Sequence, residues 1–268
     1  MPTHRFAFAL ASVLLNLAPL GELQAQASPS DPLAHRVAAL VDSLAARDEF
    51  SGVVLLARNG EPVLEKAAGL ARREARVPNT IGTAFNLGSI NKLFTQIAVH
   101  QLAARGLLHL DSTLATYWRD YPNPEVARRI TIRQMLQHRS GVGGDIFAAP
   151  ASGDRHDIRH NDDYLPLFVN RPLDFEPGTQ QRYSNAGYVL LGALVQRLSG
   201  VDYYDYVRTN IYEPAGMTET GHWAPDSLPS NAAIGYTRRT PNGAPAALPR
   251  PGSVAVFAAS APLAVRRV

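Results

Sequence analysis

Apolar side chains recur along the chain at two periods, and the period separates expected helices from expected strands. Between Leu33 and Leu44 the spacing is helical, and Asp31-Pro32 in front of it combines an acidic N-cap with a proline in the first turn. This pattern predicts a helix over about residues 32–46. By the same criteria we expect further helices over about 89–104, from Thr131 to His138, over 188–198 and over 203–211.

Two β-rich runs follow the first helix. Residues 51–57 and 63–68 are separated by Asn59-Gly60, a strong signal for a tight hairpin turn. A further strand that ends in a turn is expected over Leu173–Thr179. A helix followed by a hairpin is a common start for an α/β (α+β) domain, so we expect a helical region together with an antiparallel sheet flanked by helices.

Composition narrows the class of protein. The chain has 268 residues, of which 46% are hydrophobic and 18% charged, as is usual for a soluble globular protein of one domain or two interleaved ones. The net charge of +3 is small and no basic stripe is interleaved with aromatics, so we expect no nucleic-acid partner. The absence of cysteine excludes disulfides, thiolate chemistry and cysteine-ligated metals.

The first residues have the pattern of a secretory signal. His4-Arg5 gives a short basic start, Phe6–Leu15 is apolar, and Ala25-Gln26-Ala27 is a small-x-small cleavage pattern. The apolar run is much shorter than the ~20 residues that span a bilayer. We therefore expect a signal peptide over residues 1–27 and a secreted or periplasmic mature chain that has no membrane span.

The helix expected near residue 89 carries the strongest candidate chemistry. Ser89 and Lys92 are three residues apart, so they project from one helix face. An ammonium on an apolar face loses solvation, which favours its neutral form and makes it a plausible base for a serine nucleophile. The apolar neighbours on which this expectation depends are Ile90, Leu93, Phe94, Ile97 and Ala98.

A polar segment from Pro150 to Asp163 offers an alternative site. His156 and His160 lie four residues apart, a spacing that suits zinc on a helix. However, Asp157 stands where a metalloprotease needs the longer glutamate, and the segment has no apolar face that would bury it. We interpret it as a solvated loop and expect no metal.

Four phrases together resemble the serine β-lactamase-related family, in the branch of class C β-lactamases, D-alanyl-D-alanine carboxypeptidases and lactamase-like esterases. They occur in that family's order and cover about residues 32–237. The phrases are Phe85–Lys92, Ile130–Gly141, Pro177–Thr179 with Tyr183–Tyr188, and Pro214–Met217.

The resemblance implies roles for four residues. Ser89 would attack an amide or ester carbonyl, Lys92 would share its proton, and Tyr183 would act with Lys92 as the base and protonate the leaving group. Asn185 would bind the substrate and orient Lys92, and no cofactor is implied. Without that resemblance, Tyr183 and Asn185 also fit an ordinary turn, with the tyrosine packed on the core and the asparagine capping a helix.

One element of the family's pattern is missing. The resemblance implies a third motif, Lys-Thr-Gly or a variant, on a strand that lines the pocket, and no residue after Tyr183 completes it. Residues 244–268 contain no acidic residue, so we expect a domain over 28–243 with an incomplete sheet and a disordered, truncated or out-of-frame tail over 244–268.

The expected function is hydrolysis of a β-lactam, a D-amino-acid peptide or a small ester by a monomer. Its partner would be a small-molecule or peptide substrate. The alternative is a catalytically inactive family member, or a protein that binds cell-wall peptides without turnover.

Overall fold

The computed structural model describes residues 31–147, 157–223, 227–239 and 245–251, so the expected signal peptide lies outside the described residues. The helices are α1 (Pro32–Ala46), α2 (Asn91–Ala104), α3 (Leu114–Tyr117), α4 (Pro124–Arg129), α5 (Ile132–Leu136), α6 (Asn185–Ser199) and α7 (Tyr203–Val207). Short 3₁₀-helices are η1 (Gly88–Ile90) and η3 (Asn161–Leu167), and η4 (Arg208–Tyr212) is a short π-helix. The strands are β1 (Gly52–Arg58), β2 (Glu61–Ala68), β3 (Leu70–Arg72), β4 (Val77–Pro78), β5 (Tyr236–Arg239) and β6 (Pro245–Pro251).

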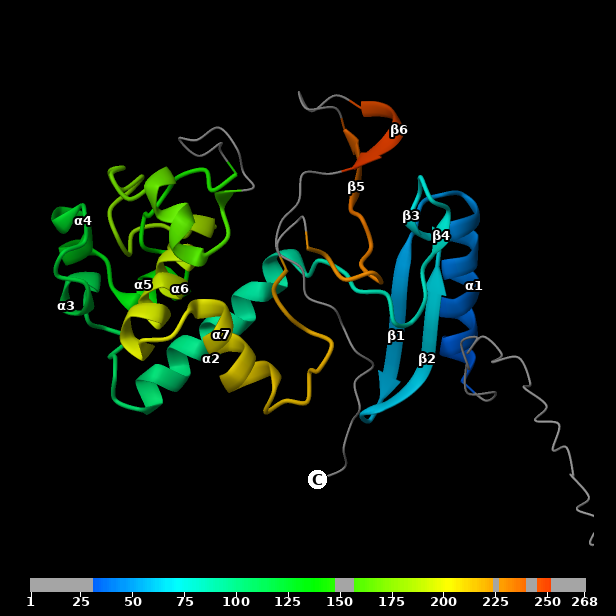
Figure 1. Ribbon diagram of the computed structural model, residues 1–268, viewed down its shortest axis with the longest axis horizontal. Coiled ribbons are helices and arrows are strands. Elements are labelled where there is room, and N and C mark those ends of the chain that lie inside the picture. Colours follow the sequence, from blue (N-terminus) through cyan, green and yellow to red (C-terminus); the bar gives the residue numbers. More distant parts are fainter. Residues whose placement is uncertain (1–30, 148–156, 224–226, 240–244, 252–268) are drawn as a thin grey trace, which may run out of the picture.

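The molecule has a helical side and a hairpin side (Figure 1). Helices α2 to α7 gather on one side, whereas β1, β2 and α1 lie on the other. Within the described ranges, no helix combines the length and apolar character needed to cross a bilayer. The α/β (α+β) class that the sequence predicts is confirmed.

The N-terminal helix and hairpin form as the sequence predicts. The Asp31 carboxylate accepts the Leu33 N–H at 2.9 Å, which caps α1. Strands β1 and β2 pair antiparallel, and Asn59 and Gly60 make the turn with φ angles of 52° and 82°. These left-handed conformations suit asparagine and glycine, which explains why this dipeptide closes the hairpin.

The sheet is small. Each strand pairs with a single neighbour, β1 with β2, β3 with β4, and β5 with β6. Composition predicted a disordered tail from residue 244, but residues 245–251 form β6, in which Pro251 lies opposite Tyr236. Residues 252–268 lie outside the described ranges, so the expectation for them stays a prediction.

The core of the helical side is built around α6. Ten of its 15 residues are buried, and the buried face of α2 packs against it. A Cβ atom on Gly192 would lie 2.8 Å from Asn161 Oδ1, so the absence of a side chain there allows η3 to approach α6 closely. This packing fixes how the first turns of α2 and α6 face each other.

Two sequence expectations in this region are wrong. Leu173–Thr179 contains no strand. Its backbone makes two separate bonds to a neighbouring loop, from Asp174 N–H to Gly141 O and from Gly178 N–H to Arg139 O, both 2.8 Å, and a turn bond from Thr179 N–H to Glu176 O at 3.1 Å. The polar segment before residue 163 is also not wholly a surface loop. Asn161 is 6% exposed and donates its side-chain N–H to Val189 O at 2.9 Å.

Truncating the centre of this core should be costly. Leu194 is fully buried, so Leu194→Ala should lower the free energy of unfolding by about 2–5 kcal/mol, through lost burial and the cavity left behind. Leu40→Ala is the matched control, because Leu40 is 56% exposed on α1 and its loss should cost less than about 0.5 kcal/mol. Urea unfolding followed by circular dichroism measures both. Equal losses would contradict the assignment of the core.

Candidate active site

Ser89 and Lys92 lie on one face of the turn that starts α2. Gly88 has a φ of 52°, and its N–H donates to Asn86 Oδ1 at 2.7 Å, so the chain enters η1 through a conformation that glycine adopts without strain. The Lys92 Nζ atom lies 3.4 Å from Ser89 Oγ. The pairing that the sequence predicts is therefore present, with the serine in the 3₁₀ turn just ahead of the α-helix.

The start of α6 is held by its N-cap. Ser184 Oγ accepts the Gly187 N–H at 2.9 Å and donates to Val142 O at 2.6 Å. The cap begins α6 at Asn185, three residues earlier than the apolar pattern predicts. It also fixes the flanking Tyr183 and Asn185 relative to the helix axis.

Both flanking side chains reach the serine and lysine. The Tyr183 hydroxyl donates to Ser89 Oγ at 2.6 Å, and Lys92 Nζ donates to Asn185 Oδ1 at 2.8 Å. The four residues that the sequence singles out thus form one connected cluster, although Ser89 and Tyr183 are 94 positions apart in the chain. Asn185 is the first residue of α6 and not its cap, and Tyr183 is 55% exposed, so neither takes the ordinary-turn role.

The surroundings of Lys92 differ from the expectation. Ile90 and Leu93 are 60% and 51% exposed, so they face away from the core and leave the ammonium to other neighbours. Lys92 Nζ instead lies 4.7 Å from the ring centroid of Tyr183 and 5.6 Å from that of Tyr188. Aromatic faces stabilise a cation through the ring quadrupole, which an aliphatic lining does not.

Tyr183 is prepared for proton transfer by its neighbours. Partial burial raises the pKa of its hydroxyl, but hydrogen bonds with Lys92 and Ser89 and the positive charge of Lys92 outweigh it, so the pKa is lower than its usual value near 10. A tyrosine with a lowered pKa that contacts a serine hydroxyl can accept the serine proton and return it to a leaving group.

His138 is the neighbour that sequence analysis missed. The sequence predicts only that a helix ends at His138. In the structure its ring lies against that of Tyr183, with 4.6 Å between the ring centroids. The nearby Ser140-Gly141 signalled that a helix stops there, but no local pattern shows which distant ring the histidine meets.

A cavity of about 190 Å³ opens beside Ser89. We call it the acyl pocket. Thr95 and Tyr203 line it, and their hydroxyls are hydrogen-bonded to each other at 2.7 Å. Burial raises the pKa of Tyr203 to about 12, so its hydroxyl is uncharged at neutral pH. The apolar and aromatic wall of the pocket is formed by Ile146, Phe147, Tyr164, Val189, Tyr203 and Tyr204.

Aspartate carboxylates lie close to Tyr204 of this wall. Asp162 and Asp163 lie on η3, and Asp202 caps α7 by accepting the Tyr204 N–H at 2.9 Å. Burial raises the pKa of the Tyr204 hydroxyl, and the charges of Asp202 and Asp163 add to the effect. Of the described residues that line the pocket, Lys92 alone carries a full charge, and it lies at the Ser89 end.

The segment considered for zinc takes a different role. His156 lies outside the described residues, and His160 Nδ1 is 3.2 Å from Asp202 Oδ2. In the part of the chain that the structure describes, no group of three or more histidine, aspartate or glutamate side chains could hold a metal ion.

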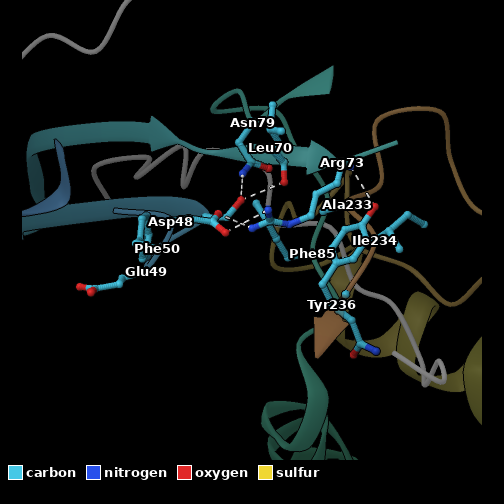
Figure 2. Close-up of a pocket in the computed structure, with 13 residues that line it drawn as sticks. Asp48, Glu49, Phe50, Leu70, Arg73, Asn79, Phe85, Ala233, Ile234 and Tyr236 are labelled. Carbon is cyan, nitrogen blue, oxygen red and sulfur yellow. Dashed lines mark hydrogen bonds and ion pairs between the residues drawn. The ribbon is translucent and has the colours of Figure 1, made fainter. Parts of the chain in front are cut away.

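A second cavity, of about 320 Å³, lies near the start of β1 (Figure 2). Its cation is already paired, because the Arg73 guanidinium binds both oxygens of Asp48 at 2.5 and 3.2 Å. The Tyr236 hydroxyl accepts the Arg73 N–H at 2.9 Å. Asn86 lines both cavities, whereas Ser89, Lys92 and Asn185 line the acyl pocket and not this second cavity.

Comparisons with known proteins show the family of the chain. The β-lactamase family model matches residues 37–264. The chain is 32% identical to penicillin-binding protein 4* of Bacillus subtilis over 183 residues, which are 68% of this chain and 40% of that protein. It is 34% identical to esterase EstB of Burkholderia gladioli over 218 residues, which are 76% of this chain and 55% of the esterase.

Solved structures give the same result. A penicillin-binding protein from Bacillus halodurans superposes with a TM-score of 0.64 and 36% identity, covering 76% of this chain and 62% of that one. EstCE1, a hydrolase with promiscuous acyltransferase activity, gives 0.67 and 28% identity, covering 82% and 59%. The chain spans about half the length of the curated relatives it matches.

The lowered pKa of Tyr183 makes a prediction about pH. If the Tyr183 phenolate is the base, kcat/KM should rise with pH as Tyr183 deprotonates. Because the pKa of Tyr183 is lowered, this rise should occur below pH 10, the usual pKa of tyrosine. Tyr183→Phe should remove this alkaline limb and lower kcat/KM by about 10²–10⁴-fold. Tyr188→Phe, the matched control on α6, should retain the limb. A limb that survives in Tyr183→Phe would assign the base to another group.

Proposed function

This chain belongs to the β-lactamase family, and we propose that it is a serine hydrolase that cleaves an amide or ester through an acyl-Ser89 intermediate. The observation that carries the proposal is the convergence of Tyr183 and Lys92 on Ser89 Oγ, at 2.6 and 3.4 Å. A serine becomes a nucleophile when a base within hydrogen-bond reach takes its proton, and these distances supply two such groups. Similarity to penicillin-binding proteins and an esterase supports the same class.

The reaction proceeds in two halves. Ser89 Oγ forms a bond to the substrate carbonyl carbon while its proton passes to Tyr183, and the tetrahedral intermediate collapses as the proton moves from Tyr183 to the departing amine or alcohol. Water then attacks the ester carbonyl of the acyl-enzyme, gives a proton to Tyr183 and releases the acid, and Ser89 recovers its proton. Lys92 supports both halves, because its positive charge favours the phenolate form of Tyr183.

The acyl pocket favours an uncharged acyl group that ends in a flat ring. Its volume of about 190 Å³ exceeds the ~150 Å³ of an apolar cavity that binds benzene. Tyr183, which protonates the leaving group, reaches Ser89 from outside this cavity, so the cavity receives the other side of the carbonyl. The charges of Asp163 and Asp202, which act on Tyr204 of the wall, oppose an acyl group that carries a carboxylate.

The place where the chain acts and the function that competes with hydrolysis are also part of the proposal. We propose that the chain acts after export, outside the cytoplasm, on the basis of the pattern in residues 1–27 and of the penicillin-binding relatives. The competing function is binding of cell-wall peptides without turnover. It differs from the proposed function in one measurable step, the formation of a covalent bond at Ser89.

A labelling experiment tests that step. The folded protein is incubated with a fluorophosphonate and with a fluorescent penicillin, and the adduct is located by mass spectrometry. We expect fluorophosphonate labelling at Ser89 that disappears in Ser89→Ala and persists in Ser230→Ala, since Ser230 is an exposed serine away from the cluster. Folded protein without an adduct would support the binding function, and the penicillin shows whether a β-lactam acylates the same serine.

A second experiment tests the acyl preference. We expect kcat/KM for p-nitrophenyl phenylacetate to exceed that for p-nitrophenyl acetate by about tenfold or more after correction for hydroxide-catalysed rates, because ring burial contributes 1.5–3 kcal/mol for an apolar side chain, by the ~25 cal/mol/Å² relation. Its p-carboxyl analogue should react about tenfold more slowly than the phenylacetate, by the energy of a nearby like charge.

The variant Phe147→Lys tests the same acyl preference through a gain of activity. Phe147 lines the pocket yet is 57% exposed, so a lysine there adds a cation at the mouth without opening the core. The variant should raise kcat/KM for the p-carboxyl ester relative to the neutral one. Val201→Lys adds the same charge at a 43% exposed position outside the pocket and should leave the ratio unchanged. Equal ratios in all three proteins would contradict the acyl assignment.

A further inference from the structure

His138 lies just beyond the C-terminal end of α5. Its φ angle is 57°, in the left-handed region that the residue just past a helix end often adopts and in which histidine, like asparagine and aspartate, is enriched. The conformation turns its ring between two tyrosines, with centroids 4.6 Å from Tyr183 and 4.9 Å from Tyr188 and interplanar angles of 32° and 34°. The way in which α5 ends therefore places the histidine ring at the candidate site.

The histidine also binds the backbone on both sides of Tyr183. Its Nδ1 atom accepts the Ser184 N–H at 3.1 Å, and its carbonyl oxygen accepts the Arg182 N–H at 2.9 Å. The residue before Tyr183 and the residue after it are thus both fixed to His138. We call these two bonds and the ring contact the His138 clamp.

Tyr183 depends on this clamp because its other side-chain contacts in the described part of the chain are with Ser89 and Lys92, the groups toward which it must be positioned. Its side chain is 55% exposed, and its hydroxyl must stay 2.6 Å from Ser89 Oγ to exchange a proton. A displacement of about 1 Å in such a group can cost 10²-fold in rate. The clamp supplies a ring that packs against Tyr183 and two hydrogen bonds that hold the neighbouring backbone, whereas much of the Tyr183 side chain is exposed to solvent.

We propose that His138 is a positioning residue whose clamp holds Tyr183 against Ser89 only while its Nδ1 atom is unprotonated. A protonated imidazole has no lone pair to accept the Ser184 N–H, so protonation breaks one anchor. It also places a cation near Lys92, the charged group that acts on His138 from α2. Within the described ranges, the other titratable side chains that contact it are Tyr183 and Tyr188, and both hydroxyls are neutral in acid.

The direction of the pH response follows from the surroundings. Burial, and then the charge of Lys92, lower the pKa of His138 below the free value near 6.5. The competent neutral form therefore persists at neutral pH, and the rate should fall as pH drops through this lowered pKa. The response rests on the proposed function, since it is read as the rate at which Ser89 reacts.

Two substitutions separate the parts of the clamp. His138→Asn retains an acceptor near the Nδ1 position, tolerates a positive φ and does not titrate, so Ser89 labelling by the fluorophosphonate should persist while the acid limb assigned to His138 disappears. His138→Phe retains a flat ring but no acceptor. It should slow labelling by about 10-fold to 100-fold and lower kcat for p-nitrophenyl phenylacetate with little change in KM.

Controls keep the outcomes distinct. His100→Asn changes an exposed histidine on α2 and should leave the pH profile of labelling unchanged. Melting temperatures of all variants identify any that fail to fold. An acid limb that is the same in His138→Asn as in the natural chain, with full labelling in His138→Phe, would overturn the proposal.

One measurement does not depend on turnover. Nitrogen chemical shifts of the His138 imidazole in the natural chain should show the tautomer with the proton on Nε2, as an Nδ1 acceptor requires. A proton on Nδ1 at neutral pH would overturn the clamp even if Ser89 reacts. An Nε2 tautomer in a protein that no probe labels would leave the clamp in place and reject the proposed hydrolase function.

Discussion

The packing of α2 against α6 is the contact on which the site depends. Buried side chains such as Phe94 and Leu102 on α2 meet the almost fully buried middle of α6 in one continuous core. Because both helices start at the same end of that core, their first turns bring Ser89 and Lys92 to Tyr183 and Asn185. The hydrogen bond from Lys92 to Asn185 is a result of this packing, since a bond of that size could not hold two helices together by itself.

Sequence reasoning succeeded where the information is local. The Asp31 cap, the Asn59-Gly60 turn and the Thr131 capping box each depend on residues within a few positions, and the structure confirms all three. Ser89 and Lys92 were predicted from their spacing, Tyr183 and Asn185 from a family resemblance, and the structure joins the four by hydrogen bonds. Their catalytic roles stay predictions until the serine is shown to react.

It failed where the answer depends on tertiary packing. The sequence placed Ile90 and Leu93 around Lys92, but which face of a helix is buried is decided by its partner, and α6 covers the opposite face. The clamp of His138 could not be read from its neighbours, because the rings it meets lie 45 and 50 positions away, as the numbering of Tyr183 and Tyr188 shows. The strand expected over Leu173–Thr179 lacks a partner strand, and only pairing makes an extended run a strand.

The shared starting end of α2 and α6 has an electrostatic consequence. Each helix carries a dipole whose positive end is its N-terminus, equivalent to roughly half an elementary charge. Two such ends meet around Ser89 and Asn185, so the backbone itself creates a positive potential there. That potential favours negatively charged species at the site, such as the Tyr183 phenolate or an oxyanion. It opposes the cation of Lys92, and the Asn185 oxygen and the two tyrosine faces offset that cost.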